Sequence, residues 1–297
     1  MSEGEAQPAA SAAPDGPVGV MDSGVGGLSV LRHLRAELPA EAFLYFADQA
    51  HIPYGPRPAE QVFAFTAAIT RFLLARQAKL VVVACNTATT AALDRLRQTF
   101  PALPFVGMEP AVKPAAAQTR SGVVGVLATP GTLSSHRYAS LMARFAADIR
   151  VLEDPCLGLV PLIEAGATQT AETRALLQRA VAPMLAAGAD TLVLGCTHYP
   201  FIRPLLGEIA GPDVTIIDPA PAVARHTRNV VQQRGQLAPE TRAGALRCYT
   251  TGDAARMAVL TADLLGVGCR TRAVRWTDNE VIANTRQGTT DYADFTD

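Results

Sequence analysis

Two short stretches of the chain share a pattern that restricts the fold more than any other feature. Residues 79–89 (KLVVVACNTAT) and 190–200 (DTLVLGCTHYP) each contain an apolar run, a small residue, a cysteine and then small polar residues. Such apolar runs are typical of strands buried on both faces of a parallel sheet. The polar residues predict a helix start, so Cys85 and Cys196 should each lie between a strand and a helix N-terminus. The helix dipole is expected to lower the pKa of a thiol there.

Strands and helices alternate along most of the chain. We expect strands at 18–21, 43–46, 105–108, 122–127 and 149–152, and helices at 59–76, 160–165, 171–186, 222–233 and 253–265. The two halves align as an internal repeat, with Asp22-Ser23 on Ala128-Thr129, Asp48 on Asp154 and Cys85 on Cys196. The pattern predicts an α/β protein of two pseudo-symmetric domains, each a mostly parallel sheet flanked by helices, facing each other across a cleft.

The expected domain boundaries follow from this repeat. The first domain should comprise residues 17–109 and 218–280, because the chain returns to it after the second domain, residues 110–217. Residues 1–16 are predicted to be a disordered leader, since they contain too few large apolar side chains to offset the entropy of ordering. Residues 281–297 are predicted to be a polar tail.

Composition excludes several classes of function. A formal net charge of −1 over 297 residues gives no electrostatic reason to expect a nucleic-acid partner. No segment approaches the roughly 18 consecutive apolar residues of a membrane helix, and the N-terminus lacks the apolar core of a secretory signal. We therefore expect a cytoplasmic protein with reduced thiols and no membrane partner.

The five cysteines include no C-x-x-C pair. This spacing argues against both a disulfide framework and a structural zinc site. We interpret Cys156, Cys248 and Cys269 as small buried apolar residues. Cys85 and Cys196 differ because one local pattern places both at strand-to-helix turns of paired units.

Two thiols that face one cleft suit acid–base chemistry at carbon. One thiolate can remove a proton from a carbon acid while the other thiol returns a proton to the opposite face. Such a pair can invert a stereocentre without a cofactor. The pKa of a free thiol, about 8.5, comes within reach of neutral pH once the surroundings depress it.

The glycine-rich stretch 22–27 (DSGVGG) is a weak candidate for a nucleotide-binding loop. Ser29 occupies the place of the third fingerprint glycine, and no G-K-[ST] follows. A turn that brings Asp22 and Ser23 to the rim of the cleft suits the sequence better, although Asp22 alone could be a helix cap. His198 could equally be a core histidine, and with Cys196 it makes a poor metal signal, so we expect no metal site.

Six motifs together resemble the glutamate racemases, within the aspartate/glutamate racemase family. They are residues 22–28 (DSGVGGL), 53–55 (PYG), 84–88 (ACNTA), 109–115 (EPAVKPA), 160–164 (VPLIE) and 194–200 (LGCTHYP). The resemblance spans about residues 18–265. It implies two pseudo-symmetric α/β domains with the active site in the interdomain cleft, and cofactor-independent interconversion of L- and D-glutamate. The D-form would supply peptidoglycan synthesis.

The resemblance also implies roles for individual residues. Cys85 would take the α-proton of D-glutamate and Cys196 that of L-glutamate, assisted by Asp22 and His198, with Glu164 orienting His198. The implied substrate-binding residues are Asp22, Ser23, Tyr54, Gly55, Asn86, Thr87, Thr129, Thr197 and His198. Glutamate is the one partner that the resemblance implies, and a homodimer is left open.

The chain departs from the usual family pattern at two places. Met21 stands where phenylalanine is usual, and residues 47–51 (ADQAH) replace a more usual Gly-Asp-Thr-Ala-Arg, which leaves the contacts just before Pro53 open. Three alternative functions also stay open: a racemase of aspartate or another small amino acid, a related decarboxylase, and a non-catalytic module that binds a small acid. A decarboxylase would be expected to keep only one of the two cysteines.

Overall fold

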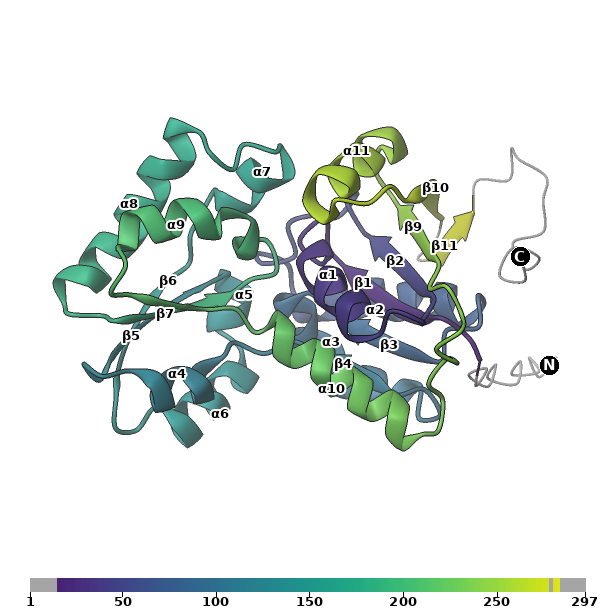
Figure 1. Cartoon of the computed structure of the whole chain (residues 1–297), viewed down its shortest axis with the longest axis horizontal. Helices are drawn as coiled ribbons and strands as arrows, with labels where there is room; N and C mark the ends of the chain where they lie inside the picture. Colours follow the sequence, from purple (N-terminus) through teal and green to yellow (C-terminus); the bar gives the residue numbers. More distant parts are fainter. Residues whose placement is uncertain (1–14, 278–279, 284–297) are drawn as a thin grey trace, which may run out of the picture.

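The computed structural model describes residues 15–277 and 280–283, which form two sheets surrounded by helices (Figure 1). The first sheet has seven strands in the order β11-β10-β9-β2-β1-β3-β4, and the second has four in the order β6-β5-β7-β8. The strands of the first sheet are β1 (Val18–Asp22), β2 (Phe43–Ala47), β3 (Leu80–Val83), β4 (Phe105–Gly107), β9 (Leu246–Thr250), β10 (Arg270–Thr277) and β11 (Glu280–Ala283). Those of the second are β5 (Val123–Ala128), β6 (Arg150–Asp154), β7 (Thr191–Gly195) and β8 (Thr215–Ile217). Among the strands in the described residues, the β10–β11 pair alone is antiparallel.

Each sheet has its own set of helices. Around the first lie α1 (Leu28–Glu37), α2 (Ala59–Leu74), α3 (Asn86–Thr99), α10 (Ala220–Gln233) and α11 (Ala254–Leu265). Around the second lie α4 (Val112–Gln118), α5 (Pro130–Leu133), α6 (His136–Phe145), α7 (Leu159–Glu164), α8 (Ala171–Ala186), α9 (Arg203–Ala210) and a short 3-10 helix, η1 (Tyr199–Ile202). The predicted α/β class, with parallel sheets flanked by helices in two domains, is confirmed.

Strands β1, β2 and β3 of the first sheet are buried on both faces. Alternate residues point to opposite faces, so Val20 and Tyr45 join one apolar cluster while Met21 and Phe46 join the other. The second sheet separates two further clusters in the same way. Burial on both faces explains why these strands are continuous apolar runs, as expected for a parallel sheet.

The internal repeat is visible in the strand order. The order β2-β1-β3-β4 in the first sheet corresponds to β6-β5-β7-β8 in the second. The strand that precedes Cys85 (β3) and the strand that precedes Cys196 (β7) therefore occupy equivalent places. In the first sheet the chain passes from β1 to β2 on one side and from β3 to β4 on the other, and the second sheet does the same from β5 to β6 and from β7 to β8. This reversal opens a crevice at the carboxyl ends of the strands, where ligands bind.

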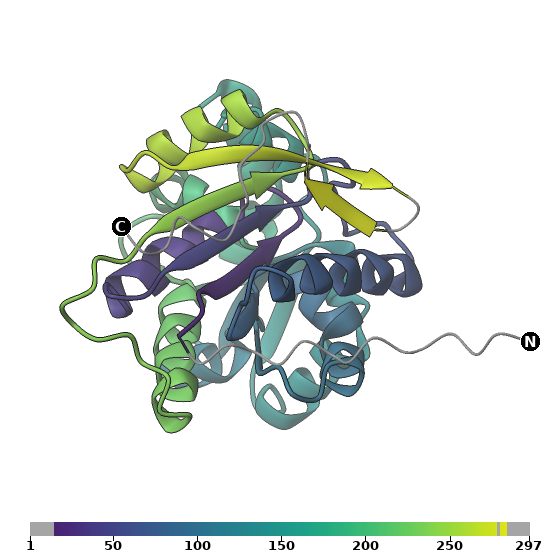
Figure 2. The ribbon, with the colours of Figure 1, turned by 90° about the vertical axis from the view of Figure 1, so that its right-hand side faces the viewer.

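The C-terminal part of the first sheet was not predicted. Strands β9 to β11 mix polar and apolar residues, and β9 is recruited to the sheet by pairing with β2, a contact between distant segments. Figure 2 shows β10 and β11 (yellow) at the edge of the sheet, where β11 lies near α2. The predicted polar tail, residues 281–297, thus begins inside a strand. The rest of that tail from residue 284, and residues 1–14 of the predicted leader, lie outside the described residues; the domain boundaries stay predictions.

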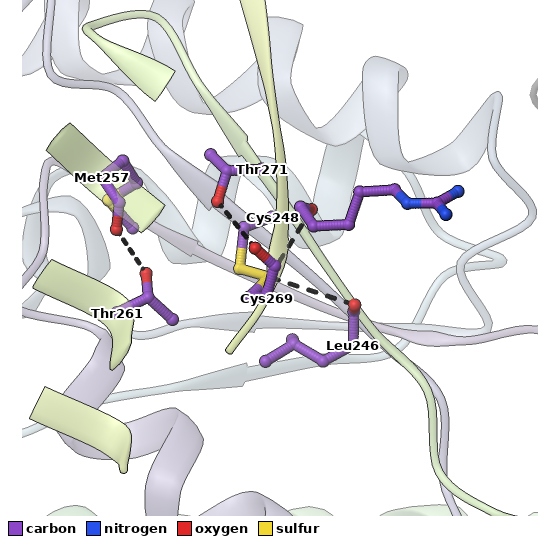
Figure 3. Close-up of a disulfide and its surroundings, with 7 residues drawn as sticks. Leu246, Cys248, Met257, Thr261, Cys269 and Thr271 are labelled. Carbon is purple, nitrogen blue, oxygen red and sulfur yellow. Dashed lines mark hydrogen bonds between the residues drawn. A yellow bond between two sulfur atoms is a disulfide. The ribbon is translucent and has the colours of Figure 1, made fainter. Parts of the chain in front are cut away.

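The structure also contains one disulfide, which contradicts the expectation of reduced thiols (Figure 3). It joins Cys248 in β9 to Cys269, which directly precedes β10, with 6.3 Å between the Cα atoms. The two residues are 21 positions apart in the sequence. They meet because β9 and β10 pair side by side, and sequence spacing could not reveal that pairing.

In the part of the chain that the structure describes, every helix is either too short or too polar to cross a bilayer.

Candidate active site

A small cavity lies at the carboxyl ends of the strands, and both domains contribute to its wall. Its lining residues are Ser23, Pro53, Tyr54, Gly55, Cys85, Asn86, Thr87, Thr129, Val160, Cys196, Thr197 and His198. The free volume is about 20 Å³, which is room for about one water molecule. The structure thus brings both cysteines and most of the predicted substrate-binding residues to a single site in a closed form.

Cys85 lies between β3 and α3. Its sulfur caps α3 by accepting a hydrogen bond from the Ala88 N–H at 3.4 Å, and its thiol donates to Ser23 Oγ at 3.8 Å. Burial raises the pKa of Cys85 to about 12, and the nearby Asp22 carboxylate adds to the rise, whereas the Ala88 and Ser23 contacts oppose it. The expectation that the helix N-terminus would lower this pKa is wrong for the closed site, because removal from water outweighs the helix N–H group.

Cys196 follows β7 and has a different neighbour. Its sulfur lies 3.7 Å from Nδ1 of His198, and Nε2 of His198 lies 2.6 Å from Oε1 of Glu164. Burial alone would lower the pKa of His198, but its contacts with Cys196 and Glu164 raise the pKa well above the ordinary value. Burial would likewise raise the pKa of Glu164, but the His198 contact lowers it. Both directions describe an imidazolium paired with a carboxylate, with Nδ1–H pointing to the Cys196 sulfur.

Glu164 makes a contact between the two domains. It comes from α7 of the second domain, and its Oε1 accepts the backbone N–H of Val25 in the first domain at 2.7 Å. A Cβ at Gly24 would overlap this carboxylate, and a Cβ at Gly26 would overlap the ring of His198. The glycines of residues 22–27 therefore permit close approach to Glu164 and His198, which is a different use from the phosphate binding of a nucleotide loop.

Asp22 lies beneath the cavity wall and not at its rim, contrary to our expectation. The side chain is fully buried, and its carboxylate accepts the Gly24 N–H at 3.0 Å and the Thr197 hydroxyl at 3.1 Å. Burial raises the pKa of Asp22, while the charge of His198 opposes the rise. Its carboxylate also faces the backbone N–H of Gly27, which directly precedes α1. Its position ties the turn after β1 to the turn after β7.

The polar wall of the cavity carries groups that suit a carboxylate or an ammonium group. Thr87 and Thr129 contact each other across the two domains at 2.8 Å. Both polar atoms of the Asn86 side chain are buried without a hydrogen-bond partner in the described structure. A buried polar group left unpaired costs about 1–3 kcal/mol, so the Asn86 amide calls for a ligand with both donors and acceptors. The N-terminus of α3 adds backbone N–H groups that favour an anion.

The sequence did not reveal several residues that support the site. Asp48 accepts hydrogen bonds from Tyr54, Thr251 and Trp276, and thereby fixes Tyr54 at the cavity. Gln49 contacts Glu164. The position of Asp48 and Gln49 directly after a strand is the one sequence feature that could have indicated their role at the site. Trp276 comes from β10, a strand that the sequence did not predict. Within the described residues, no cluster of three or more His, Cys, Asp or Glu side chains could hold a metal ion.

Comparison with known proteins supports one family over most of the chain. The family described as Asp/Glu/Hydantoin racemase matches residues 18–227. The glutamate racemase of Ectopseudomonas mendocina is 56% identical over 250 residues, which cover 84% of this chain and 95% of that protein. The glutamate racemase of Roseiflexus is 55% identical over 245 residues, covering 82% of this chain and 90% of that protein.

Solved structures agree with the sequence comparison. Glutamate racemase RacE1 of Bacillus anthracis superposes with a TM-score of 0.79 at 31% identity, covering 90% of this chain and all of the other. The Escherichia coli glutamate racemase, solved with L-glutamate and the activator UDP-MurNAc-Ala, gives a TM-score of 0.77 at 32% identity, covering 90% of this chain and 99% of the other. The resemblance predicted from six sequence motifs is confirmed: the chain belongs to the Asp/Glu/hydantoin racemase family and, within it, to the glutamate racemases.

Proposed function

We propose that this chain interconverts L- and D-glutamate by a two-thiol mechanism that needs no cofactor. One observation carries the proposal: Cys85 and Cys196, each from the equivalent turn of its own domain, line the same small cavity. A substrate held there would present one face of its α-carbon to each sulfur. A module that only binds a small acid would have no use for a thiol at both turns.

The state of Cys85 in the resting enzyme suits the L-to-D direction. The raised pKa of Cys85 keeps this residue a thiol, which is the proton donor that this direction requires. Cys196 acts as the base: its thiolate removes the α-proton of L-glutamate, with His198 Nδ1 3.7 Å from the sulfur. Cys85 then delivers its proton to the opposite face, leaving D-glutamate, a Cys85 thiolate and a Cys196 thiol.

The D-to-L direction uses the same groups in reverse. Cys85, as the thiolate, removes the α-proton of D-glutamate, and the Cys196 thiol supplies the proton to the other face. The substrate ammonium group, placed near the carbon under attack, would favour the thiolate form of Cys85. Between turnovers the two cysteines must exchange protons with water to return to the starting state.

The lining residues provide for the substrate without an arginine. The substrate carboxylates would accept hydrogen bonds from the α3 N-terminus and from the hydroxyls of Ser23 and Thr129, and the Asn86 amide would gain its missing partners. The Thr197 hydroxyl donates to Asp22, so its oxygen would accept from the substrate ammonium group. Tyr54, Gly55 and Thr87 complete the enclosure, while Asp22 acts from beneath the wall. Because the cavity has room for only about one water molecule, the domains must separate to admit glutamate.

The identity of the substrate is supported by relatives. The glutamate racemase of Francisella tularensis has been solved with D-glutamate, and the Escherichia coli protein with L-glutamate. By the same analogy we propose that the enzyme supplies D-glutamate for peptidoglycan synthesis and acts in the cytoplasm. A homodimer is a further proposal that a measurement of mass in solution would test.

The decisive experiment incubates the purified protein in heavy water with L- or D-glutamate, in the absence of pyridoxal phosphate. We expect optical rotation to decay to zero from both directions and deuterium to enter the α-position of the product. L-aspartate under the same conditions serves as the matched substrate control. Binding of glutamate without inversion or exchange would instead identify a non-catalytic module, and faster inversion of aspartate would identify a different racemase.

A further inference from the structure

Gln49 joins Glu164 of the active site to the end of β9, the strand that pairs with β2. It follows Asp48 directly after β2 and is half-buried. Its Nε2 donates to Glu164 Oε2 at 3.1 Å, and its Oε1 accepts the hydroxyl of Thr250, at the end of β9, at 2.8 Å. One amide thus connects the last residue of β9 to the carboxylate that holds His198.

The direction of each hydrogen bond from Glu164 through Gln49 to Thr250 is fixed. Glu164 is ionised, because its lowered pKa keeps it a carboxylate, so it can only accept and the amide NH₂ of Gln49 must face it. The Gln49 oxygen then faces Thr250, whose hydroxyl must donate. Thr250 Oγ1 in turn accepts the N–H of Gly252 at 3.0 Å, which leaves its hydrogen free for Gln49.

The packing around Gln49 allows little freedom. A Cβ at Gly252 would lie 2.8 Å from Gln49 Oε1 and 2.9 Å from Gln49 Cβ. The absence of a side chain at residue 252 therefore makes the space in which the amide lies. With Thr250 fully buried, the Gln49 side chain is held at its far end and along its length.

We propose that Gln49 is a positioning residue for the Cys196 half of the site. It holds Oε2 of Glu164, which turns Oε1 towards His198 Nε2, and His198 then presents Nδ1–H to the Cys196 sulfur. The contact crosses from the first domain to the second, so Gln49 orients Glu164 only when the site is closed. This proposal rests on the proposed racemase function, and it assigns a use to a position where the chain departs from the usual pattern of its family.

The first test compares Gln49→Met, which keeps the length of the side chain but removes both polar atoms, with Gln178→Met on the exposed surface of α8. A lost hydrogen bond to a charged group should lower kcat about 10-fold. KM should change less than about two-fold, because Gln49 does not line the cavity. Gln178→Met should leave both constants unchanged. If kcat of Gln49→Met stays within about two-fold of an active wild type, the proposal is wrong while the racemase function stands; an inactive wild type would reject the function itself.

A double-mutant cycle separates positioning from general loosening. If Gln49 acts through Glu164, the Gln49→Met change should have no further effect on kcat in a Glu164→Ala background. An equal loss in both backgrounds would overturn the proposal.

Thr250→Val and Thr250→Ser provide an independent test that leaves Gln49 in place. Valine removes the hydroxyl that orients the amide and should lower kcat less than Gln49→Met does, whereas serine should retain kcat. In Gln49→Met and Thr250→Val, peptide mass spectrometry should show a changed rate of iodoacetamide alkylation at Cys196 and an unchanged rate at Cys85, and in Thr250→Ser neither rate should change. Equal changes at both cysteines would indicate a merely structural role and would contradict the proposal.

Discussion

Cys85 and Cys196 occupy equivalent turns of two similar domains, yet their surroundings differ. Beside Cys85 lie a neutral hydroxyl, Ser23, and a carboxylate, Asp22, while Cys196 faces the His198–Glu164 pair. The position two residues after the cysteine shows the difference directly: it is Thr87 in the first turn and His198 in the second. The backbone repeat places two sulfurs at one cavity, and the side chains around them break the symmetry.

This difference suits a reaction with two non-equivalent starting states. A proton must be held at one sulfur while the other sulfur is free to accept one. Burial and the negative Asp22 hold the proton on Cys85, whereas the positive charge of His198 points at Cys196. Two identical turns would give both sulfurs the same surroundings, so the asymmetry is the feature that the proposed mechanism would use to favour one enantiomer in the resting site.

The largest effect should come from removing either sulfur. Cys85→Ala and Cys196→Ala should each lower racemisation by at least about 10³-fold, because a positioned acid or base contributes about 10²–10⁴-fold and none replaces it. Each variant should nevertheless exchange the α-proton of one enantiomer with solvent and retain its configuration. In heavy water, Cys196→Ala should exchange the α-proton of D-glutamate, and Cys85→Ala should exchange that of L-glutamate. NMR of the recovered substrate measures this. Near-normal racemisation by either variant would reject the two-thiol mechanism.

Replacing the unlike neighbours of the two cysteines should have the next largest effect. His198→Asn removes the charge that faces Cys196 and should lower kcat about 100-fold. Thr87→Val, at the equivalent position of the other turn, should mainly raise KM, since Thr87 lines the cavity and contacts Thr129. Steady-state kinetics with both enantiomers distinguishes the two outcomes. Equal losses of kcat would show that the asymmetry has no catalytic meaning.

The raised pKa of His198 also predicts that the stability difference between wild type and His198→Asn depends on pH. Its pKa is raised in the folded state, so the folded protein binds this proton more tightly than the unfolded chain does. The resulting stabilisation is present below the ordinary pKa of 6.5 and is lost as the pH rises through the raised value. Denaturant unfolding of wild type and His198→Asn should therefore differ more at pH 6 than at strongly alkaline pH; a constant difference would contradict the raised pKa.

A smaller effect should appear in the reactivity of Cys85 in the unliganded enzyme. Its pKa of about 12 means that the thiolate fraction, and hence the alkylation rate, should rise about 10-fold per pH unit between pH 7 and 10 without a plateau. Peptide mass spectrometry after iodoacetamide treatment resolves the two cysteines within one sample. A plateau for Cys85 below pH 9 would show that the helix N-terminus outweighs burial.

The sequence predicted the parts of the molecule that local patterns determine. The apolar runs before Cys85 and Cys196 were sufficient to predict buried parallel strands, the repeat and a shared site, because each run is short and continuous. The strands after residue 245 were missed, since β9 becomes a strand only by pairing with β2.

Within the site, residue types were easier to predict than their electrostatics. The sequence placed Cys85 correctly at a helix N-terminus, but it could not show that Cys85 is only 5% exposed, and burial reverses the direction of its pKa shift. Asp22 and Gln49 illustrate the same point, because their roles depend on Thr197 and Glu164, which are more than 100 residues away. Contacts between the two domains leave no trace in local spacing.

The smallest effect on activity should follow from breaking the Cys248–Cys269 disulfide, which lies outside both turns. Closing a loop of 21 residues is worth about 3 kcal/mol in the chain-entropy account, so Cys248→Ala, or a reductant on the wild type, should lower the free energy of unfolding by up to that amount. Neither treatment should change kcat, because neither cysteine lines the cavity. Urea unfolding and kinetics on the same samples check both statements. A change in kcat, or in the alkylation of either Cys85 or Cys196, would show that the edge of the first sheet influences the two turns, and that their difference does not arise from their immediate neighbours alone.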